Sequence, residues 1–215
     1  MSDDLNESRD DSSNAKKKGL PVVTADDVIA RPRGERPDNQ LESRELYRGK
    51  IFTLNHDTIE FPDGSQAEFD IVRHSGASAI VPFLNDPTGE EPQLLLLRQY
   101  RYAAGGYIYE IPAGKLDGNE SPEECAAREL KEETGCTAAH LEPLTTMFTT
   151  PGFTDEVIHL FMATGLTHGQ SAREADEFAD VIVMRLSEAL ELIGNGQIMD
   201  AKTALGILYA AGYMT

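Results

Sequence analysis

The stretch GKLDGNESPEECAARELKEETGC, residues 114–136, decides how the middle of this chain folds. Ser121 is a suitable helix N-cap, the proline after it fits a first helical turn, and Glu124 completes a capping box. Gly135 is suited to end the helix in a left-handed conformation. The sequence therefore predicts a helix over about 122–134.

This helix would bring acidic side chains together. At about 100° per residue, Glu129, Glu132 and Glu133 lie within a sector of about 100°, and Glu129 and Glu133 stack one turn apart. Like charges at this spacing repel by a few tenths of a kcal/mol per pair, roughly. The apolar stripe expected to hold the helix on a sheet consists of Ala126, Ala127 and Leu130.

Two interpretations of the carboxylates are open at this point. The first is a solvated acidic face. The second is a site for a hard cation, in which the carboxylates and a backbone carbonyl provide part of the oxygen shell of Mg²⁺, and water and a substrate phosphate complete it. In the second case the mutual repulsion is the source of the metal affinity. Arg128, four residues from both Glu124 and Glu132, can partly neutralise them in either case.

The charge of the chain excludes some partners. Its 215 residues have a formal net charge of -18, and residues 41–215 contribute -16 of it, because residues 1–40 hold 9 acidic and 7 basic side chains. So acidic a surface repels nucleic acid and anionic membranes. No apolar run reaches the roughly 18 residues of a membrane helix, and the N-terminus does not read as a secretory signal. We expect a cytoplasmic protein.

The cysteines fit the same compartment. The chain has two, Cys125 and Cys136, and their spacing of 11 residues matches no zinc motif. Such thiols suit a reducing environment as inert side chains. We therefore expect neither a disulfide framework nor a zinc site.

The chain divides into three parts. Residues 1–40 are polar and are predicted to be a mostly disordered tail. Residues 41–75 alternate apolar and polar side chains on both sides of PDGS (62–65), which predicts an antiparallel β region with a hairpin. Residues 76–215 are predicted to form one domain.

The order of elements in this domain predicts its class. ASAIVPFL (77–84) and PQLLLLRQYR (92–101) are nearly continuous apolar runs, typical of central strands covered on both faces. The remaining predictions are a short strand leading into a loop at 107–114, a strand–turn–strand at 142–166, a last strand at 178–186, and two amphipathic helices with Ser187 and Asp200 as N-caps. This order indicates an α/β (α+β) sandwich around a mixed sheet.

The spacing in 114–136 resembles the signature box of the Nudix hydrolases. Its fixed positions here are Gly114, Glu120, Arg128, Glu129, Leu130, Glu132, Glu133, Gly135 and Cys136. Cys136 is the one departure, because an aliphatic residue is more usual there. The resemblance implies an α/β/α sandwich around a mixed sheet. It also implies hydrolysis of a nucleoside diphosphate linked to another moiety, by water attack on phosphorus assisted by Mg²⁺ or Mn²⁺.

The resemblance also implies roles in the box. Glu129 and Glu133 would be the principal metal ligands, with the backbone carbonyl of Ala113 as a further ligand. Glu132 would be a third ligand or a catalytic group beside the metal, and Arg128 belongs with the catalytic set. Glu120 is expected to pair with Arg128 and to fix the loop to the helix.

The flanks resemble the ADP-ribose pyrophosphatase branch of this family. The similar segments are VRHSGASAIVPF, LLLLRQYRY, YEIPAGKLD, TTPGFTDEVIHLFMA and DAKTA (200–204). Pro151, 16 residues after Gly135, matches a proline common in that branch and is counted with the substrate-binding residues. The expected substrate is ADP-ribose, hydrolysed to AMP and ribose 5-phosphate. The alternatives are another nucleotide sugar, NADH, a dinucleoside polyphosphate, or a non-catalytic ADP-ribose sensor.

The flanks supply candidates for substrate binding. Arg98 and Arg101 lie three apart near the end of a predicted strand, and arginine forks suit phosphate oxygens. The alternative for each is a surface salt bridge. Glu110 could accept hydrogen bonds from adenine or ribose, and its alternative is a strand-end ion pair.

The loop PGFTDE supplies the first candidate for water activation, Glu156, because a general base must lie within hydrogen-bond reach of the water. Glu174 and Glu177 are rivals from a later loop, and a solvated carboxylate is the alternative for all three. In the similar branch, strands at about 45–75 often exchange between the chains of a homodimer, so a homodimer is expected.

Overall fold

A computed structural model of the chain describes residues 39–169 and 179–212. The tail predicted at 1–40 lies outside the described residues except for Asn39 and Gln40, and Gln40 already begins the first strand. Within the described ranges, no helix has the length and apolar character needed to cross a bilayer.

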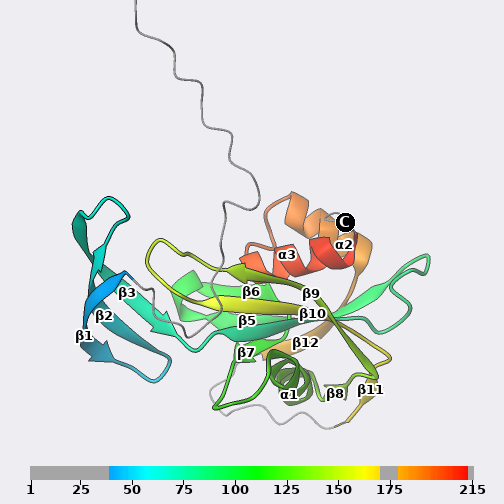
Figure 1. Cartoon of the computed structure of the whole chain (residues 1–215). Helices are drawn as coiled ribbons and strands as arrows, with labels where there is room; N and C mark the ends of the chain where they lie inside the picture. Colours follow the sequence, from blue (N-terminus) through cyan, green and yellow to red (C-terminus); the bar gives the residue numbers. More distant parts are fainter. Residues whose placement is uncertain (1–38, 170–178, 213–215) are drawn as a thin grey trace, which may run out of the picture. The chain divides into compact units, whose positions relative to one another are not determined.

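The first three strands form an antiparallel sheet of their own, in the order β1 (Gln40–Arg48), β2 (Phe52–Glu60) and β3 (Gln66–His74) (Figure 1). The predicted hairpin joins β2 to β3. Gly64 adopts a φ of 82° in this turn, and its N–H donates to the carbonyl of Phe61 at 2.8 Å. The antiparallel β region expected at 41–75 is therefore present.

A four-stranded sheet has the order β7 (Ala113–Lys115), β4 (Ala77–Pro82), β10 (Val157–Thr164) and β9 (His140–Phe148). β4 and β10 are parallel, whereas β4 with β7 and β10 with β9 are antiparallel, so this sheet is mixed as predicted. Every residue of β4 is buried, in agreement with its continuous apolar sequence.

A three-stranded sheet has the order β12 (Ala179–Arg185), β5 (Gln93–Arg101) and β6 (Gly106–Glu110), all antiparallel. A single bridge between Phe83 and Leu94 connects the end of β4 to β5. The short elements are the 3-10 helix η2 (Tyr102–Ala104) and the paired strands β8 (Cys136–Thr137) and β11 (Thr167–His168).

The segment expected to be one short strand and a loop at 107–114 contains parts of two strands in two sheets. β6 ends at Glu110 and β7 starts at Ala113, because Pro112 has no N–H to offer a ladder. The backbone groups at this break are still paired: the Ile111 N–H donates to Thr203 Oγ1 at 2.9 Å, and the Pro112 carbonyl accepts from the Ile80 N–H at 2.9 Å.

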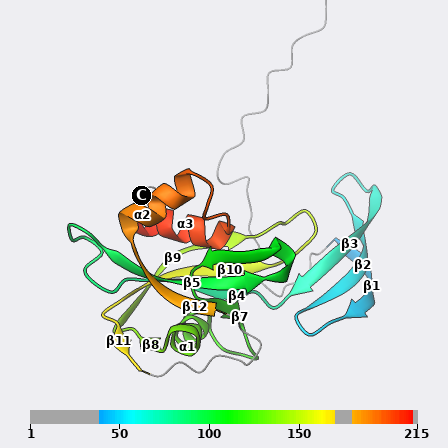
Figure 2. The same ribbon diagram turned by 180° about the vertical axis from the view of Figure 1, so that it is seen from behind.

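Helices cover both faces of the β layer. α1 (Pro122–Thr134) lies on one face, and α2 (Leu186–Gly194) and α3 (Ala201–Ala210) lie on the other (Figures 1 and 2). Side chains of β4 alternate between them: Ile80 packs with Ala126 and Leu130 of α1, while Ala79 and Val81 share a core with Ile207 of α3. The predicted α/β/α sandwich is confirmed.

Two local predictions were wrong. Ala127 is exposed, and Cys125 is buried in the stripe instead, because α1 turns its apolar face one residue earlier than expected. The N-cap of α2 is Arg185 rather than Ser187, because the helix begins at Leu186 and Ser187 already lies in its first turn, where its hydroxyl donates to Glu91 at 2.9 Å. Asp200 does cap α3, accepting from the Thr203 N–H at 3.0 Å.

Candidate active site

The predicted caps of α1 are present. Ser121 Oγ accepts from the Glu124 N–H at 3.2 Å, and Glu124 Oε2 accepts from the Ser121 N–H at 2.7 Å. Gly135 ends the helix with a φ of 75°. These caps fix where α1 begins and ends. The rotational position of its acidic side chains follows from them.

Glu129 and Glu133 turn inward, toward the backbone of β7. They are only 8% and 4% exposed. Glu133 Oε2 accepts from the Ala113 N–H at 2.9 Å. The carboxylate of Glu129 lies over Gly114, where a β-carbon would overlap both its oxygens. Two buried carboxylates thus meet the first two residues of β7, and the solvated-face interpretation does not describe them.

Arg128 lies at the centre of the acidic group. It donates to Glu120 at 2.7 and 3.1 Å, to Glu129 Oε1 at 2.5 Å, to Glu132 at 3.1 Å and to the Lys115 carbonyl at 3.0 Å. The guanidinium lowers the pKa of Glu120 to about 2, and the bond to Glu120 raises the pKa of Arg128. The predicted pair of Glu120 with Arg128, which joins the loop to the helix, is confirmed.

The donor set of this region suits a divalent cation in type. Glu129, Glu132 and Glu133 offer carboxylate oxygens, which hard cations prefer. Glu129 and Glu133, which lie one helical turn apart, are buried. Across residues 39–169 and 179–212, however, no three acidic, histidine or cysteine side chains already face one point as metal ligands. Arg128 is bonded to Glu129 and Glu132, and the Ala113 N–H to Glu133. The metal roles of these residues and of the Ala113 carbonyl remain predictions.

A second charged network lies where β5, β6 and α3 meet. Glu110 is 2% exposed and accepts two bonds from Arg101, at 2.6 and 2.8 Å, and one from Lys202 at 2.8 Å. Lys202 also contacts Asp200 at 2.9 Å. Burial disfavours the charged form of Glu110, but Arg101 and Lys202 outweigh it, so the pKa of this carboxyl lies below its ordinary value. The strand-end ion pair foreseen as the alternative for Glu110 is therefore formed.

Arg98 has different partners from this network. It donates to Asp180 of β12 at 3.1 Å, and its guanidinium lies 4.0 Å from the centre of the Tyr107 ring. Both partners of the ion pair are largely exposed, with 46% and 68% of their side-chain surface accessible. For Arg98 the surface salt bridge is the arrangement present.

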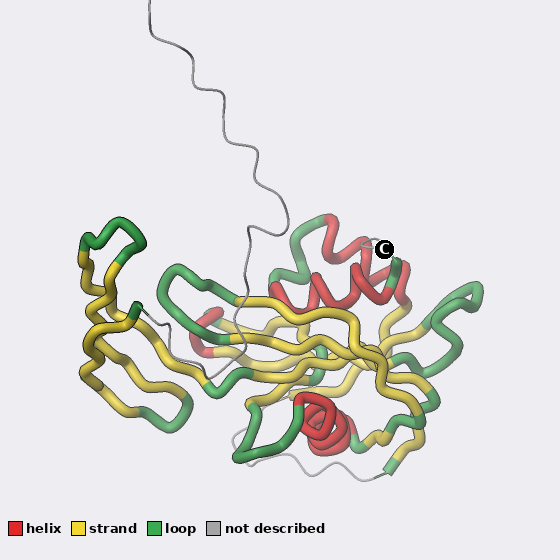
Figure 3. The backbone as a smooth tube through the Cα atoms, viewed as in Figure 1, coloured by secondary structure: helices red, strands yellow, loops and turns green. Residues whose placement is uncertain are grey.

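Glu156 lies in the loop between β9 and β10. Loops are drawn in green in Figure 3. Glu156 Oε2 accepts from Thr149 Oγ1 at 2.9 Å, and Oε1 lies 3.5 Å from His74 Nδ1. Pro151 is exposed in the same loop. The rival carboxylates Glu174 and Glu177 lie outside the described residues.

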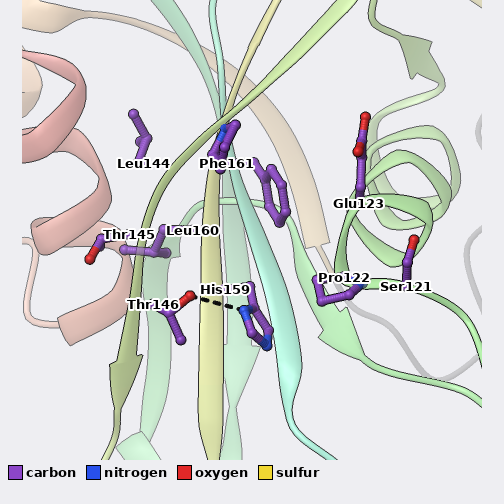
Figure 4. A pocket seen from close by; sticks show the side chains of 10 residues that line it. Ser121, Pro122, Glu123, Leu144, Thr145, Thr146, His159, Leu160 and Phe161 are labelled. Carbon is purple, nitrogen blue, oxygen red and sulfur yellow. Dashed lines mark hydrogen bonds between the residues drawn. The ribbon is translucent and has the colours of Figure 1, made fainter. Parts of the chain in front are cut away.

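A cavity of about 440 Å³ lies elsewhere, between the first turn of α1 and strands β9 and β10 (Figure 4). Its wall includes Ser121, Phe161 and His159, whose Nδ1 lies 3.0 Å from Thr146 Oγ1. None of the predicted catalytic, metal or substrate residues lines it. The cavity therefore does not mark the predicted site.

Sequence reasoning missed some residues that the structure joins to the predicted ones. Lys202 is the second partner of Glu110, and only the likeness of DAKTA drew attention to that segment. Arg73 and Asp155 connect β3 to the loop of Glu156 through a contact at 3.2 Å. These partners are 82 and 92 residues apart in the sequence, so no local pattern could have revealed them.

Comparisons with known proteins agree with the geometry. A model described as the NUDIX domain matches residues 74–203, and one described as the nucleoside diphosphate sugar hydrolase N-terminal domain matches residues 39–72. The chain is 38% identical to a methanol dehydrogenase activator of Bacillus methanolicus and 37% identical to an ADP-ribose pyrophosphatase of Bacillus subtilis. Each alignment covers 80% of this chain and 91% of the relative.

A solved structure shares the fold. The crystal structure of an ADP compounds hydrolase superposes with a TM-score of 0.68 at 23% sequence identity, covering 81% of this chain and 92% of the other. At this identity the likeness concerns the arrangement of strands and helices. It includes most of the described chain.

Proposed function

The chain belongs to the Nudix hydrolase family, and on that premise we propose that it hydrolyses the pyrophosphate bond of ADP-ribose to AMP and ribose 5-phosphate. The observation that supports this proposal most is the burial of Glu129 and Glu133 against β7, in a box with all its charged positions intact. The similarity to an ADP-ribose pyrophosphatase over most of both chains favours this substrate.

Nudix hydrolases act with divalent cations, and for this chain we propose Mg²⁺, with Mn²⁺ as the alternative. Glu129, Glu133, Glu132 and the carbonyl of Ala113 would hold the metal. When bound, such a cation neutralises pyrophosphate charge and lowers the pKa of a bound water. Arg128 would direct Glu129 and Glu132 to the same side of α1, as its bonds to both carboxylates do here.

The hydrolytic step needs a base for the attacking water. The water oxygen forms a bond to one phosphorus, the bridging P–O bond breaks, and the leaving phosphate takes the electron pair. We assign the water proton to Glu156, a partly buried carboxylate whose position is fixed by Thr149 and which lies 3.5 Å from His74 Nδ1. A carboxylate has about four acceptor sites, so its existing contacts still leave room for a water.

Arg101 is the proposed phosphate ligand. Its side chain keeps 44% of its surface accessible while it holds Glu110, and two of its five N–H donors are used in that pair. Glu110 would then orient Arg101 rather than contact the nucleotide. Arg98 and Pro151, both on the surface, are proposed for the outer part of the same substrate site.

We further propose a homodimer formed through the sheet β1–β2–β3. Large apolar side chains exposed on this sheet and its turns are Leu41, Leu46, Tyr47, Ile51, Phe52, Phe61 and Phe69. Exposed apolar groups of this extent mark interaction surfaces, and a second copy of the same sheet would cover them in a symmetric pair. Sedimentation should show a dimer that Leu46→Lys weakens and Val183→Lys, an exposed change on β12, does not.

Product analysis tests the activity. Purified protein with Mg²⁺ would be offered ADP-ribose, ADP-glucose, GDP-mannose, UDP-glucose, NADH and diadenosine polyphosphates. Glu133→Gln removes one charge of the predicted metal site without changing its size. Glu123→Gln, an exposed position in the same helix, is the matched control.

The outcomes separate the parts of the proposal. We expect AMP and ribose 5-phosphate to form fastest from ADP-ribose, with a loss of about 100-fold or more in Glu133→Gln and little change in Glu123→Gln. Faster cleavage of another nucleotide would contradict ADP-ribose as the substrate, and the proposal of pyrophosphate hydrolysis would remain. Binding of ADP-ribose with no cleavage by the unaltered protein would show a sensor instead.

A further inference from the structure

One charged side chain is buried in a sheet that buries nothing else. The structure describes all of residues 39–74, and among them only Asp57 of β2 is buried, with 2% of its surface exposed. Its Oδ1 has no hydrogen-bond partner, and its Oδ2 pairs with Arg73 of β3. An unsatisfied buried carboxylate oxygen reduces stability, so its presence needs a reason other than the folding of this sheet.

Arg73 joins Asp57 to the β9–β10 loop, because it pairs with both Asp57 and Asp155. Its guanidinium also contacts Asp155 Oδ2 at 3.2 Å. Asp155 Oδ1 accepts from the His74 N–H at 2.9 Å, so both oxygens of Asp155 are held by the end of β3. The Asp57–Arg73–Asp155 array therefore connects the middle of β2 to the residue just before Glu156.

Backbone bonds extend the same attachment. The Val72 N–H donates to the Phe153 carbonyl at 2.8 Å, and the Asp155 N–H donates to the Val72 carbonyl at 3.3 Å. Val72 and Thr154 form a parallel bridge. The loop is thus added to the edge of β3 as a short extra strand, with the side-chain array at its end.

The same end of β3 contacts Glu156 itself. His74 Nδ1 lies 3.5 Å from Glu156 Oε1 and accepts from the Gly76 N–H at 2.9 Å. Because Nδ1 accepts in that bond, its lone pair faces the Gly76 amide and the ring orientation is fixed by the chain. The 3.5 Å contact is therefore not a hydrogen bond from Nδ1: Thr149 holds the carboxylate of Glu156, and β3 holds the preceding residue, Asp155.

We propose that Asp57 and Arg73 are positioning residues, which hold the β9–β10 loop so that the carboxylate of Glu156 stays at the distance from the phosphorus that proton abstraction requires. This inference rests on the proposed role of Glu156 in hydrolysis. It assigns a function in catalysis to the N-terminal sheet of the same chain. Misplacing a catalytic group by about 1 Å can lower a rate about 100-fold, so a loosened loop should be visible in kcat.

Two variants test the array, with one control. Asp57→Asn keeps the size of the side chain and removes the buried charge, and Arg73→Gln removes the link itself. Arg48→Gln is the control, because Arg48 forms an ion pair with Glu45 within β1 of the same sheet. Hydrogen exchange at the amides of Val72 and Asp155 reports loop attachment without any need for activity, and steady-state kinetics reports its consequence.

We expect amide exchange at Val72 and Asp155 to rise about tenfold in Asp57→Asn and Arg73→Gln, and kcat to fall about tenfold with KM within about twofold. Melting temperature should fall less in Asp57→Asn than in Arg73→Gln, because Asn removes the buried charge whose Oδ1 has no hydrogen bond, whereas Arg73→Gln leaves that charge without its ion-pair partner. In a Glu156→Gln background, the same changes should lower kcat no further, because the positioned group is already absent.

The two readouts distinguish the possible failures. If amide exchange is faster in both variants but the unaltered protein is inactive, the proposed hydrolysis is wrong and the attachment of the loop to β3 stands. Exchange equal to that of Arg48→Gln would overturn the positioning role. An additive loss of kcat on top of Glu156→Gln would overturn it as well, because the array would then act through something other than Glu156.

Discussion

The carboxylate of Glu129 occupies the space where a side chain on Gly114 would lie. A β-carbon at Gly114 would overlap the carboxyl carbon and both oxygens of Glu129, which is buried between α1 and β7. The first glycine of the box and its first inward-facing glutamate, 15 positions apart in the sequence, are thus one steric unit. The glycine is needed for close approach, and its backbone φ is not in the left-handed region.

Gly114→Ala should therefore displace Glu129 and lower activity strongly. If Glu129 holds the metal, we expect kcat to fall about 100-fold and the concentration of Mg²⁺ needed for half-maximal rate to rise, because the carboxylate must leave its position. Gly106→Ala, a strand position with no atom near its new methyl group, is the control. Rates measured against Mg²⁺ concentration give both values. Equal rates and equal Mg²⁺ requirements in the two variants would contradict the claim that Gly114 makes room for Glu129.

Glu120→Gln should reduce stability at neutral pH and have little effect in acid. Arg128 lowers the pKa of Glu120 from 4.5 to about 2 in the folded chain. A carboxyl with a lowered folded pKa stabilises the fold above its unfolded pKa and loses this effect as the pH falls through the folded pKa. The difference in melting temperature from the unaltered protein should be largest above about pH 5 and vanish near pH 2.

Melting curves between pH 2 and pH 7, roughly the range over which carboxylates titrate, provide the measurement. The exposed Glu142→Gln is the control, and it should show no such pH-dependent difference. A constant difference across the whole range would mean that the bond between Glu120 and Arg128 contributes nothing through charge.

The sequence was most informative where the structure is local. Ser121, Glu124 and Gly135 act within one or two helical turns, so their chemistry fixed the bounds of α1 before any contact was known. The apolar runs of β4 and β5 likewise indicate burial on both faces without reference to other strands. Ser187 is not the cap of α2 because the helix begins one residue earlier, at Leu186, whose N–H bonds to the carbonyl of the distant Pro92.

Long-range side-chain pairs could not be predicted in this way. For Arg101 and Glu110 the sequence left two roles open, substrate binding or an ion pair. Nothing in it indicated that Lys202 reaches Glu110 from 92 positions away. Asp57 sits in an alternating strand pattern that marks it only as a polar position. Its ion-pair partner, Arg73, belongs to the next strand, and no local pattern records that pairing.

Lys202→Met should destabilise the protein through Glu110. Removing one partner of a buried charge leaves it less compensated, and Arg101 alone would remain, so we expect a loss of about 1–3 kcal/mol in the free energy of unfolding. Lys50→Met, an exposed position, should be close to neutral. Chemical denaturation gives the values. The double variant Glu110→Gln with Lys202→Met should recover part of the loss, and no recovery would show that Lys202 acts mainly through Asp200.

Gly206→Ala should destabilise the protein by overpacking between α3 and the sheet. Gly206 is buried in α3, and a β-carbon there would lie 3.0 Å from Val81 and 3.2 Å from Ile111. Alanine in a helix interior gains about 0.5–1 kcal/mol over glycine, but extra atoms in a packed core cost about 1–3 kcal/mol. Because Val81 belongs to the fully buried β4 and cannot move outward, the packing cost should prevail, with a net loss of about 1 kcal/mol in unfolding free energy. Gly194→Ala in α2, with open space at its β-carbon, should instead be neutral or stabilising, and urea denaturation of the pair decides whether α3 is packed as closely as described.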